Sequence, residues 1–127
     1  MARILIVDDD EQVRTMLRIT LQREGYEVSE AANGSEATRL YRAQPGGVVI
    51  TDIIMPEKEG IGTILELRKD FPDVQIIAIS GGGKNDPEDY LKVARTLGAK
   101  YTFVKPVDRT ELLAAVKNLA VLAPVEV

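Results

Sequence analysis

Hydrophobic residues fall into short runs of strand length, separated by longer stretches with helical spacing. The runs are Ile4–Val7, Glu27–Ala31, Val48–Ile50, Val74–Ile79 and Tyr101–Val104. The first, third and fourth are continuous rather than alternating, with Gln75 as the one polar residue in the fourth, which is typical of strands that are covered on both faces. The second and fifth are weaker candidates. The pattern therefore predicts a buried parallel sheet.

Between and after these runs, apolar residues recur at spacings of three and four, the period of an amphipathic helix. Gly25 and Gly98 stand where left-handed residues end helices. Asp86-Pro87 and Asp108 with Glu111 are typical of helix N-termini. The predicted helical stripes are Val13 to Leu21, Ala37 to Tyr41, Ile61 to Phe71, Tyr90 to Leu97 and Leu112 to Ala120.

Strand and helix thus alternate five times along the chain. This order favours right-handed crossovers and a doubly wound α/β sheet with helices on both faces. No internal repeat, low-complexity tract or linker interrupts it. We predict one domain over residues 1–122 and a short flexible tail over residues 123–127.

The composition narrows the chemistry. The 127 residues carry a net charge of −4 and include no Cys and no His. The charge argues against direct binding to nucleic acid, which needs a basic face. The two absences exclude disulfides, thiolate or histidine zinc sites, Ser-His-Asp triads and any phosphohistidine on this chain. Carboxylates, hydroxyls and lysines are the remaining reactive groups.

The N-terminal apolar stretch is too short for a signal peptide, because three acids follow Val7 directly. No run approaches the roughly 20 apolar residues of a membrane span. We therefore expect a cytoplasmic protein with no membrane contact.

Polar residues follow four of the five predicted strands. They are Asp8-Asp9-Asp10, Asp52, Ser80 and Lys105. Ligands of such sheets bind outside the carboxyl ends of the strands, so these side chains are expected at one edge. Clustered carboxylates repel, so either one is protonated or a cation lies among them. Oxygen ligands alone favour Mg²⁺, or Mn²⁺ in its place.

Each of these residues taken singly has an ordinary structural interpretation. An Asp that follows a strand commonly makes a turn or caps a helix. We interpret Asp10 in this way, as the residue that opens the first helix. The convergence of acids, a hydroxyl and a lysine at four strand ends nevertheless favours a functional site over coincidence.

The motifs that carry these residues are Ile4-Leu-Ile-Val-Asp-Asp, Thr51-Asp-Ile-Ile-Met-Pro with Gly60, Ile77-Ala-Ile-Ser and Lys105-Pro106. In this order, and over nearly the whole chain, they resemble the response-regulator receiver domains of two-component signalling, of the chemotaxis-regulator kind. The resemblance implies a flavodoxin-like fold with strand order 2-1-3-4-5. It also implies a phosphorylation switch that catalyses only its own phosphorylation and slow dephosphorylation.

The resemblance further implies a role for each acid. Asp52 would be the phosphoacceptor. Asp9 would bind Mg²⁺ directly and Asp8 partly through water, while Asp52 itself and the backbone carbonyl of Ile54 would complete the protein ligands. Mn²⁺ is a possible substitute for the ion.

By the same resemblance, Lys105 would hold a phosphoryl oxygen and Ser80 would donate a hydrogen bond to another. The peptide bond between Lys105 and Pro106 would be cis. The phosphoryl group would come from a sensor histidine kinase or a phosphotransfer protein, and its arrival would change binding to a downstream protein that the sequence does not identify.

The chain departs from the family pattern at three places. Thr102 stands three residues before Lys105, where the family often has an aromatic switch residue, and Phe103 should face the other side of the strand. Gly81–Gly83 lengthen the loop after the fourth strand. We predict a mobile loop there, because the sequence lacks the spacing of a P-loop. Ile54 is apolar where relatives often carry a polar residue.

Three other functions are compatible with parts of the pattern. A pseudo-receiver would bind partners without phosphorylation, but the intact acidic set argues against it. An aspartyl-phosphate phosphohydrolase would resemble Asp-x-Asp at the nucleophile, and Ile54 stands where the second acid would be. A flavin binder would need a hydroxyl-rich phosphate loop and flanking aromatic residues, and both are missing.

Overall fold

The computed structural model describes residues 2–53, 60–81 and 87–122. It contains the five predicted strands, joined into one parallel sheet in the predicted order β2-β1-β3-β4-β5. The strands are β1 (Arg3–Val7), β2 (Glu27–Ala31), β3 (Val48–Asp52), β4 (Gln75–Ser80) and β5 (Tyr101–Val104).

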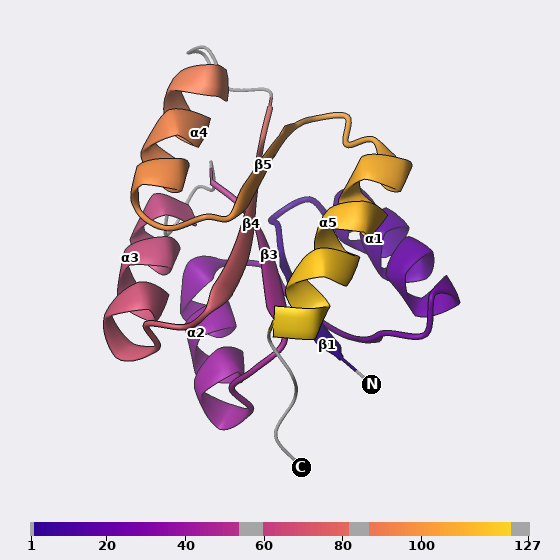
Figure 1. The fold of residues 1–127 in the computed structure, drawn as a ribbon, viewed down its shortest axis with the longest axis horizontal. Coiled ribbons are helices and arrows are strands. Elements are labelled where there is room, and N and C mark those ends of the chain that lie inside the picture. Colours follow the sequence, from indigo (N-terminus) through magenta and orange to yellow (C-terminus); the bar gives the residue numbers. More distant parts are fainter. Residues whose placement is uncertain (1, 54–59, 82–86, 123–127) are drawn as a thin grey trace.

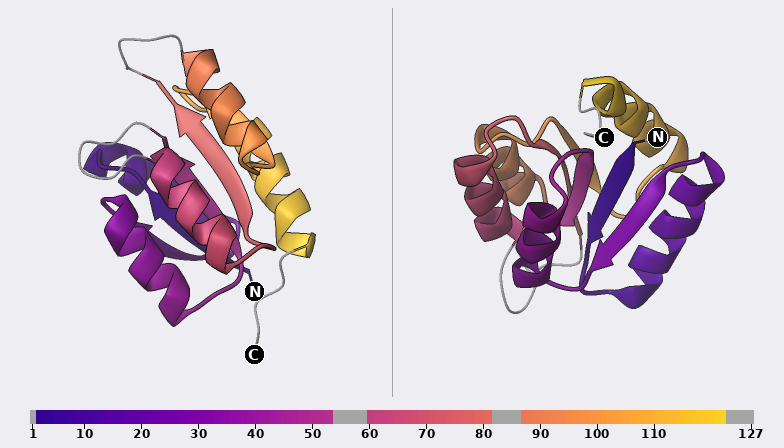
Figure 2. Two further views of the ribbon diagram at one scale, coloured as in Figure 1. Left: turned by 90° about the vertical axis from the view of Figure 1, so that its left-hand side faces the viewer. Right: turned by 90° about the horizontal axis from the view of Figure 1, so that it is seen from below.

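The five predicted helices are also present, one after each strand. They are α1 (Glu11–Arg23), α2 (Gly34–Ala43), α3 (Gly60–Asp70), α4 (Pro87–Thr96) and α5 (Arg109–Leu122). Figure 1 shows α2, α3 and α4 on one side of the sheet and α1 and α5 on the other. The view from below in Figure 2 shows the strands lying between these two layers.

The strand patterns follow from this layering. On β1, Ile4 and Ile6 pack against α1 and α5, whereas Leu5 and Val7 pack on the opposite face. Both sets are buried, which confirms that the continuous apolar runs mark strands covered on both sides. Phe103 belongs to the cluster beneath α1 and α5. Thr102 instead contacts Arg95 of α4.

The limits of three predicted strands differ from the observed ones: β1 begins at Arg3, β3 extends to Asp52, and β4 runs from Gln75 to Ser80. The fourth strand was expected to begin at Val74, but β4 begins at Gln75. The amide of Val74 donates a hydrogen bond to the carbonyl of Phe71 at 3.0 Å, so this residue closes the turn before the strand. Its side chain is still buried, which explains why the apolar pattern includes it.

The predicted helix ends are found wherever the structure describes them. The side chain of Asp10 accepts a hydrogen bond from the amide of Gln12 and so caps α1, as expected. Asp108 accepts one from the amide of Glu111 at 3.0 Å. Gly25 and Gly98 adopt φ angles of 92° and 118°.

Some expectations fall outside the described residues. The cap at Asp86, most of the loop Gly81–Gly83 and the tail over residues 123–127 belong to this group. Within the part of the chain that the structure describes, no helix is long and apolar enough to cross a membrane.

Candidate functional site

The candidate site lies where the strand order changes direction. From β1 the chain runs outward to β2 at one edge of the sheet, whereas β3, β4 and β5 build the other side. The carboxyl ends of β1 and β3 therefore flank the switch point at which sheets of this kind bind ligands. Asp8 and Asp9 follow β1 directly, and Asp52 is the last residue of β3.

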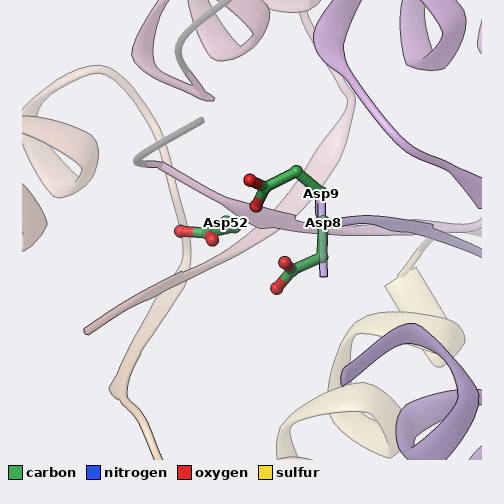
Figure 3. Close-up of side chains that lie close together, drawn as sticks. All are labelled: Asp8, Asp9 and Asp52. Carbon is green, nitrogen blue, oxygen red and sulfur yellow. The ribbon is translucent and has the colours of Figure 1, made fainter. Parts of the chain in front are cut away.

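Three of the predicted acids converge at this point. Figure 3 shows the side chains of Asp8, Asp9 and Asp52 turned toward the same space from two neighbouring strands. One carboxylate oxygen from each lies within 4.8 Å of the other two. Asp8 and Asp52 are buried, whereas Asp9 is exposed. The cluster therefore has a closed floor and one side that faces solvent.

Asp8 is held on all sides. Its side chain is fully buried, and Oδ1 accepts a hydrogen bond from the amide of Asp10 at 2.9 Å. Oδ2 forms an ion pair with Nζ of Lys105 at 2.9 Å. Its own amide donates to the carbonyl of Ala31, which extends the pairing of β1 with β2 by one residue. A buried carboxylate needs such partners, because burial without them is costly.

Lys105 connects the end of β5 to both buried acids. Its Nζ lies 3.0 Å from Oδ2 of Asp52 and 2.9 Å from Oδ2 of Asp8. Burial alone would lower the pKa of this ammonium, but the two carboxylates outweigh burial and raise the pKa above the usual 10.5. The Lys105–Pro106 peptide bond is cis, as predicted.

The charges of the cluster do not balance. Three carboxylates and one ammonium leave two negative charges in a largely buried space. Oxygen donors in excess of positive charge suit a hard divalent cation, and Mg²⁺ fits this donor set. Asp8, Asp9 and Asp52 are thus able to hold such an ion. Ile54, whose carbonyl was the fourth predicted ligand, lies outside the described residues.

Ser80 ends β4, the strand between those that carry Asp52 and Lys105. Its side chain is fully buried, and its hydroxyl has no hydrogen-bond partner among the described residues. Its carbonyl accepts a hydrogen bond from the amide of Lys105 at 2.8 Å, which holds the backbone of Ser80 against that of Lys105. A buried hydroxyl without a partner carries a desolvation cost that an incoming oxygen atom would relieve.

The backbone around Asp52 is closely packed. The hydroxyl of Thr51 donates to the carbonyl of Asp52 at 2.9 Å. A Cβ atom at Gly60, the first residue of α3, would lie only 2.1 Å from the same carbonyl oxygen. Any larger residue at position 60 would push α3 away from β3. The close contact therefore explains why the motif has a glycine at this position.

One contact at the site was not anticipated from the sequence. Arg14 of α1 donates a hydrogen bond through Nη1 to the carbonyl of Asp8 at 2.6 Å. Its one signal in the sequence is its place four residues after Asp10, where a helical side chain reaches back toward the preceding loop.

A doubly wound parallel sheet with acids at the switch point and a lysine directly after the fifth strand defines a flavodoxin-like α/β fold with an acidic site. The comparisons identify the family. The family model for the response regulator receiver domain matches residues 4–117. The chain therefore belongs to the response regulator receiver family, which operates in two-component systems.

Two relatives differ in how much of their own length this chain covers. It is 37% identical over 119 residues to the chemotaxis protein CheY of Thermotoga maritima, covering 93% of this chain and 97% of that protein. It is also 37% identical to the probable transcriptional regulator ycf27 of Cyanophora paradoxa, over 92% of this chain. The chain spans about half of that regulator, 47% of its length.

A solved structure agrees with the fold. The response regulator protein TrrA of Thermotoga maritima, in complex with Mg²⁺ and BeF, superposes with a TM-score of 0.80 at 34% identity. The alignment covers 94% of this chain and 99% of TrrA.

Proposed function

We propose that this domain is a phosphorylation switch in which Asp52 accepts a phosphoryl group from a sensor histidine kinase or a phosphotransfer protein. In the reaction, a carboxylate oxygen of Asp52 forms a bond to phosphorus. The phosphorus–nitrogen bond of the donor's phosphohistidine breaks, and its electron pair stays with the imidazole. Because this chain has no His, the phosphohistidine must lie outside the residues of this sequence.

The observation that carries the proposal is the position of Lys105. Its ammonium lies 3.0 Å from Oδ2 of Asp52 and is held there by Asp8. A phosphoryl group added to Asp52 brings negative oxygens to this same place. Lys105 can neutralise one of them without a large movement, and placement of opposite charge is the main requirement of phosphoryl transfer.

The metal ligands we propose are Asp8, Asp9, Asp52 and the backbone carbonyl of Ile54, with Mg²⁺ as the ion and Mn²⁺ as a substitute. When bound, the ion supplies the positive charge that the carboxylate cluster lacks. Asp8 and Asp52 are already desolvated and oriented, so little rearrangement of their side chains is needed.

The signal would leave the site through Ser80. Its buried hydroxyl has no partner among the described residues and can donate to a phosphoryl oxygen. That new hydrogen bond is present only in the phosphorylated state, so it can shift a conformational equilibrium. We propose that this shift changes binding to a downstream protein, and that residues 1–122 form the receiver domain.

Stoichiometry and turnover test this function. The chain is incubated with acetyl phosphate and Mg²⁺, and both protein-bound and released phosphate are measured. We expect at most one phosphoryl group per chain, slow release, and no labelling in the presence of a chelator. Rapid multiple turnover would indicate a phosphohydrolase. Mg²⁺ binding without any labelling would indicate a pseudo-receiver.

A further inference from the structure

Arg14 of α1 connects the loop after β1, which carries Asp8 and Asp9, to Glu30 of β2. Nη1 donates to the carbonyl of Asp8 at 2.6 Å, and Nε lies 3.4 Å from Oε1 of Glu30 on β2. The other oxygen of Glu30 pairs with Nε of Arg18 at 3.0 Å. The Arg14 side chain is only 16% exposed, compared with 36% for Arg18. Arg14 is therefore held in place rather than free in solvent.

The two acids of the loop differ in what holds them. Asp8 is fixed by burial, by Lys105 and by the amide of Asp10. The side chain of Asp9 has no hydrogen bond or ion pair within the described residues, although its carboxylate belongs to the cluster. Its direction therefore depends on its backbone. The carbonyl that Arg14 contacts belongs to the peptide unit that joins Asp8 to Asp9.

We propose that Arg14 is a positioning residue of the metal site, which fixes the Asp8–Asp9 peptide and thereby aims the Asp9 carboxylate. Glu30 pairs with the guanidinium of Arg14. The planar guanidinium can contact a carbonyl and a carboxylate at the same time, which an ammonium on a flexible stem does less well. The inference deepens the proposed function, because it concerns the same ion site.

The direction in which Mg²⁺ affinity changes when Arg14 is replaced distinguishes a positioning role from a simple effect of its charge. Removing a positive charge near the site should by itself strengthen the binding of a cation. Losing the orientation of Asp9 should weaken it. Groups that orient metal ligands typically contribute 10- to 100-fold to affinity. We therefore expect Arg14→Met to weaken Mg²⁺ and Mn²⁺ binding about tenfold, at the low end of that range.

Arg18→Met is the matched control. It removes the same charge from the same helix and the same glutamate, but Arg18 does not touch Asp8. Mn²⁺ binding measured by electron paramagnetic resonance and Mg²⁺ binding measured by calorimetry should change less than about twofold in this variant. Arg14→Lys, which retains one donor, should bind more tightly than Arg14→Met. Equal affinities in Arg14→Met and Arg18→Met would overturn the proposal.

A second readout does not require an ion. In metal-free protein, the NMR signal of the Asp9 amide should shift and its order parameter should fall in Arg14→Met but not in Arg18→Met. An unchanged Asp9 amide in Arg14→Met contradicts the positioning role. If the unmodified protein fails to bind any divalent ion, the proposed function is contradicted, and the Asp9 amide still decides the role of Arg14.

Discussion

Lys105 and Asp52 meet across an intervening strand. Lys105 follows β5 and Asp52 ends β3, yet Nζ of the lysine lies 3.0 Å from Oδ2 of the acid because the side chain extends past the end of β4. Ser80 is the last residue of β4, the strand that lies between β3 and β5, and its side chain is buried. The site thus combines groups from the ends of four strands, and its stability should depend on the ion pair.

Lys105→Met should lower the free energy of unfolding near neutral pH by about 2 kcal/mol in the presence of a chelator. This is below the roughly 3–5 kcal/mol for breaking a fully buried pair, because Lys105 is partly exposed. The raised pKa of Lys105 means that its contribution is complete below pH 10.5 and is lost as pH rises through the folded-state pKa.

The difference in stability between the unmodified protein and Lys105→Met should therefore shrink as pH rises above about 10.5, as measured by thermal unfolding from neutral to alkaline pH. Lys117→Met on the exposed face of α5 serves as the control. A difference that stays constant across this pH range would mean that the charge of Lys105 does not stabilise the fold.

Asp9→Ala and Asp10→Ala should change different properties, Mg²⁺ affinity in the first variant and stability in the second. Asp9 contributes an oxygen to the cluster, so its loss should weaken Mg²⁺ binding and leave stability without metal nearly unchanged. Asp10 caps α1 through the amide of Gln12, so its loss should cost about 1 kcal/mol of stability and leave Mg²⁺ affinity nearly unchanged. Calorimetric titration and thermal unfolding of both variants distinguish the two. If the two variants lost Mg²⁺ affinity equally, the assignment of Asp9 rather than Asp10 as the ion ligand would be wrong.

Ser80→Ala should uncouple phosphorylation from partner binding without destabilising the fold. The hydroxyl has no partner among the described residues, so removing it should leave the free energy of unfolding unchanged or raise it by up to about 1 kcal/mol. Labelling of Asp52 and thermal unfolding are measured together with binding to the downstream protein. Normal coupling in Ser80→Ala would refute the role given to this hydroxyl.

Thr102 provides the contrast. It occupies the position at which receivers often carry an aromatic residue, and here its hydroxyl accepts a hydrogen bond from Arg95 of α4 at 2.7 Å in an exposed setting. Thr102→Ala should hardly affect partner binding. With beryllofluoride as a phosphoryl mimic, NMR shifts should be larger for the amides of residues 80–86 than for those around Thr102. Shifts centred on Thr102 would overturn this view of the switch.

Much of the fold could be predicted because the pattern and the topology agree. The continuous burial of Val48–Ile50 requires cover on both faces, and five alternations of strand and helix leave few sheet orders. The convergence of Asp8, Asp52 and Lys105 follows, because the ends of parallel strands share one edge.

The details of the site could not be predicted in this way. Asp8 and Asp9 are adjacent and chemically identical, and only the structure shows that the first is buried against Lys105 and the second is exposed. The contact of Arg14 depends on side-chain rotamers and on the path of the loop after β1, which periodicity does not encode. The close approach of Gly60 to the carbonyl of Asp52 likewise depends on how near α3 lies to β3.

The most direct test of the central claim is the site of phosphorylation. The protein and its Asp52→Asn and Asp10→Asn variants are incubated with acetyl phosphate and Mg²⁺, and their intact masses are measured. We predict one phosphoryl group on the unmodified protein and on Asp10→Asn, and none on Asp52→Asn, because Asp52 ends the central strand β3 within the acid cluster and beside Lys105, whereas Asp10 caps α1. An adduct of undiminished yield on Asp52→Asn would contradict the assignment.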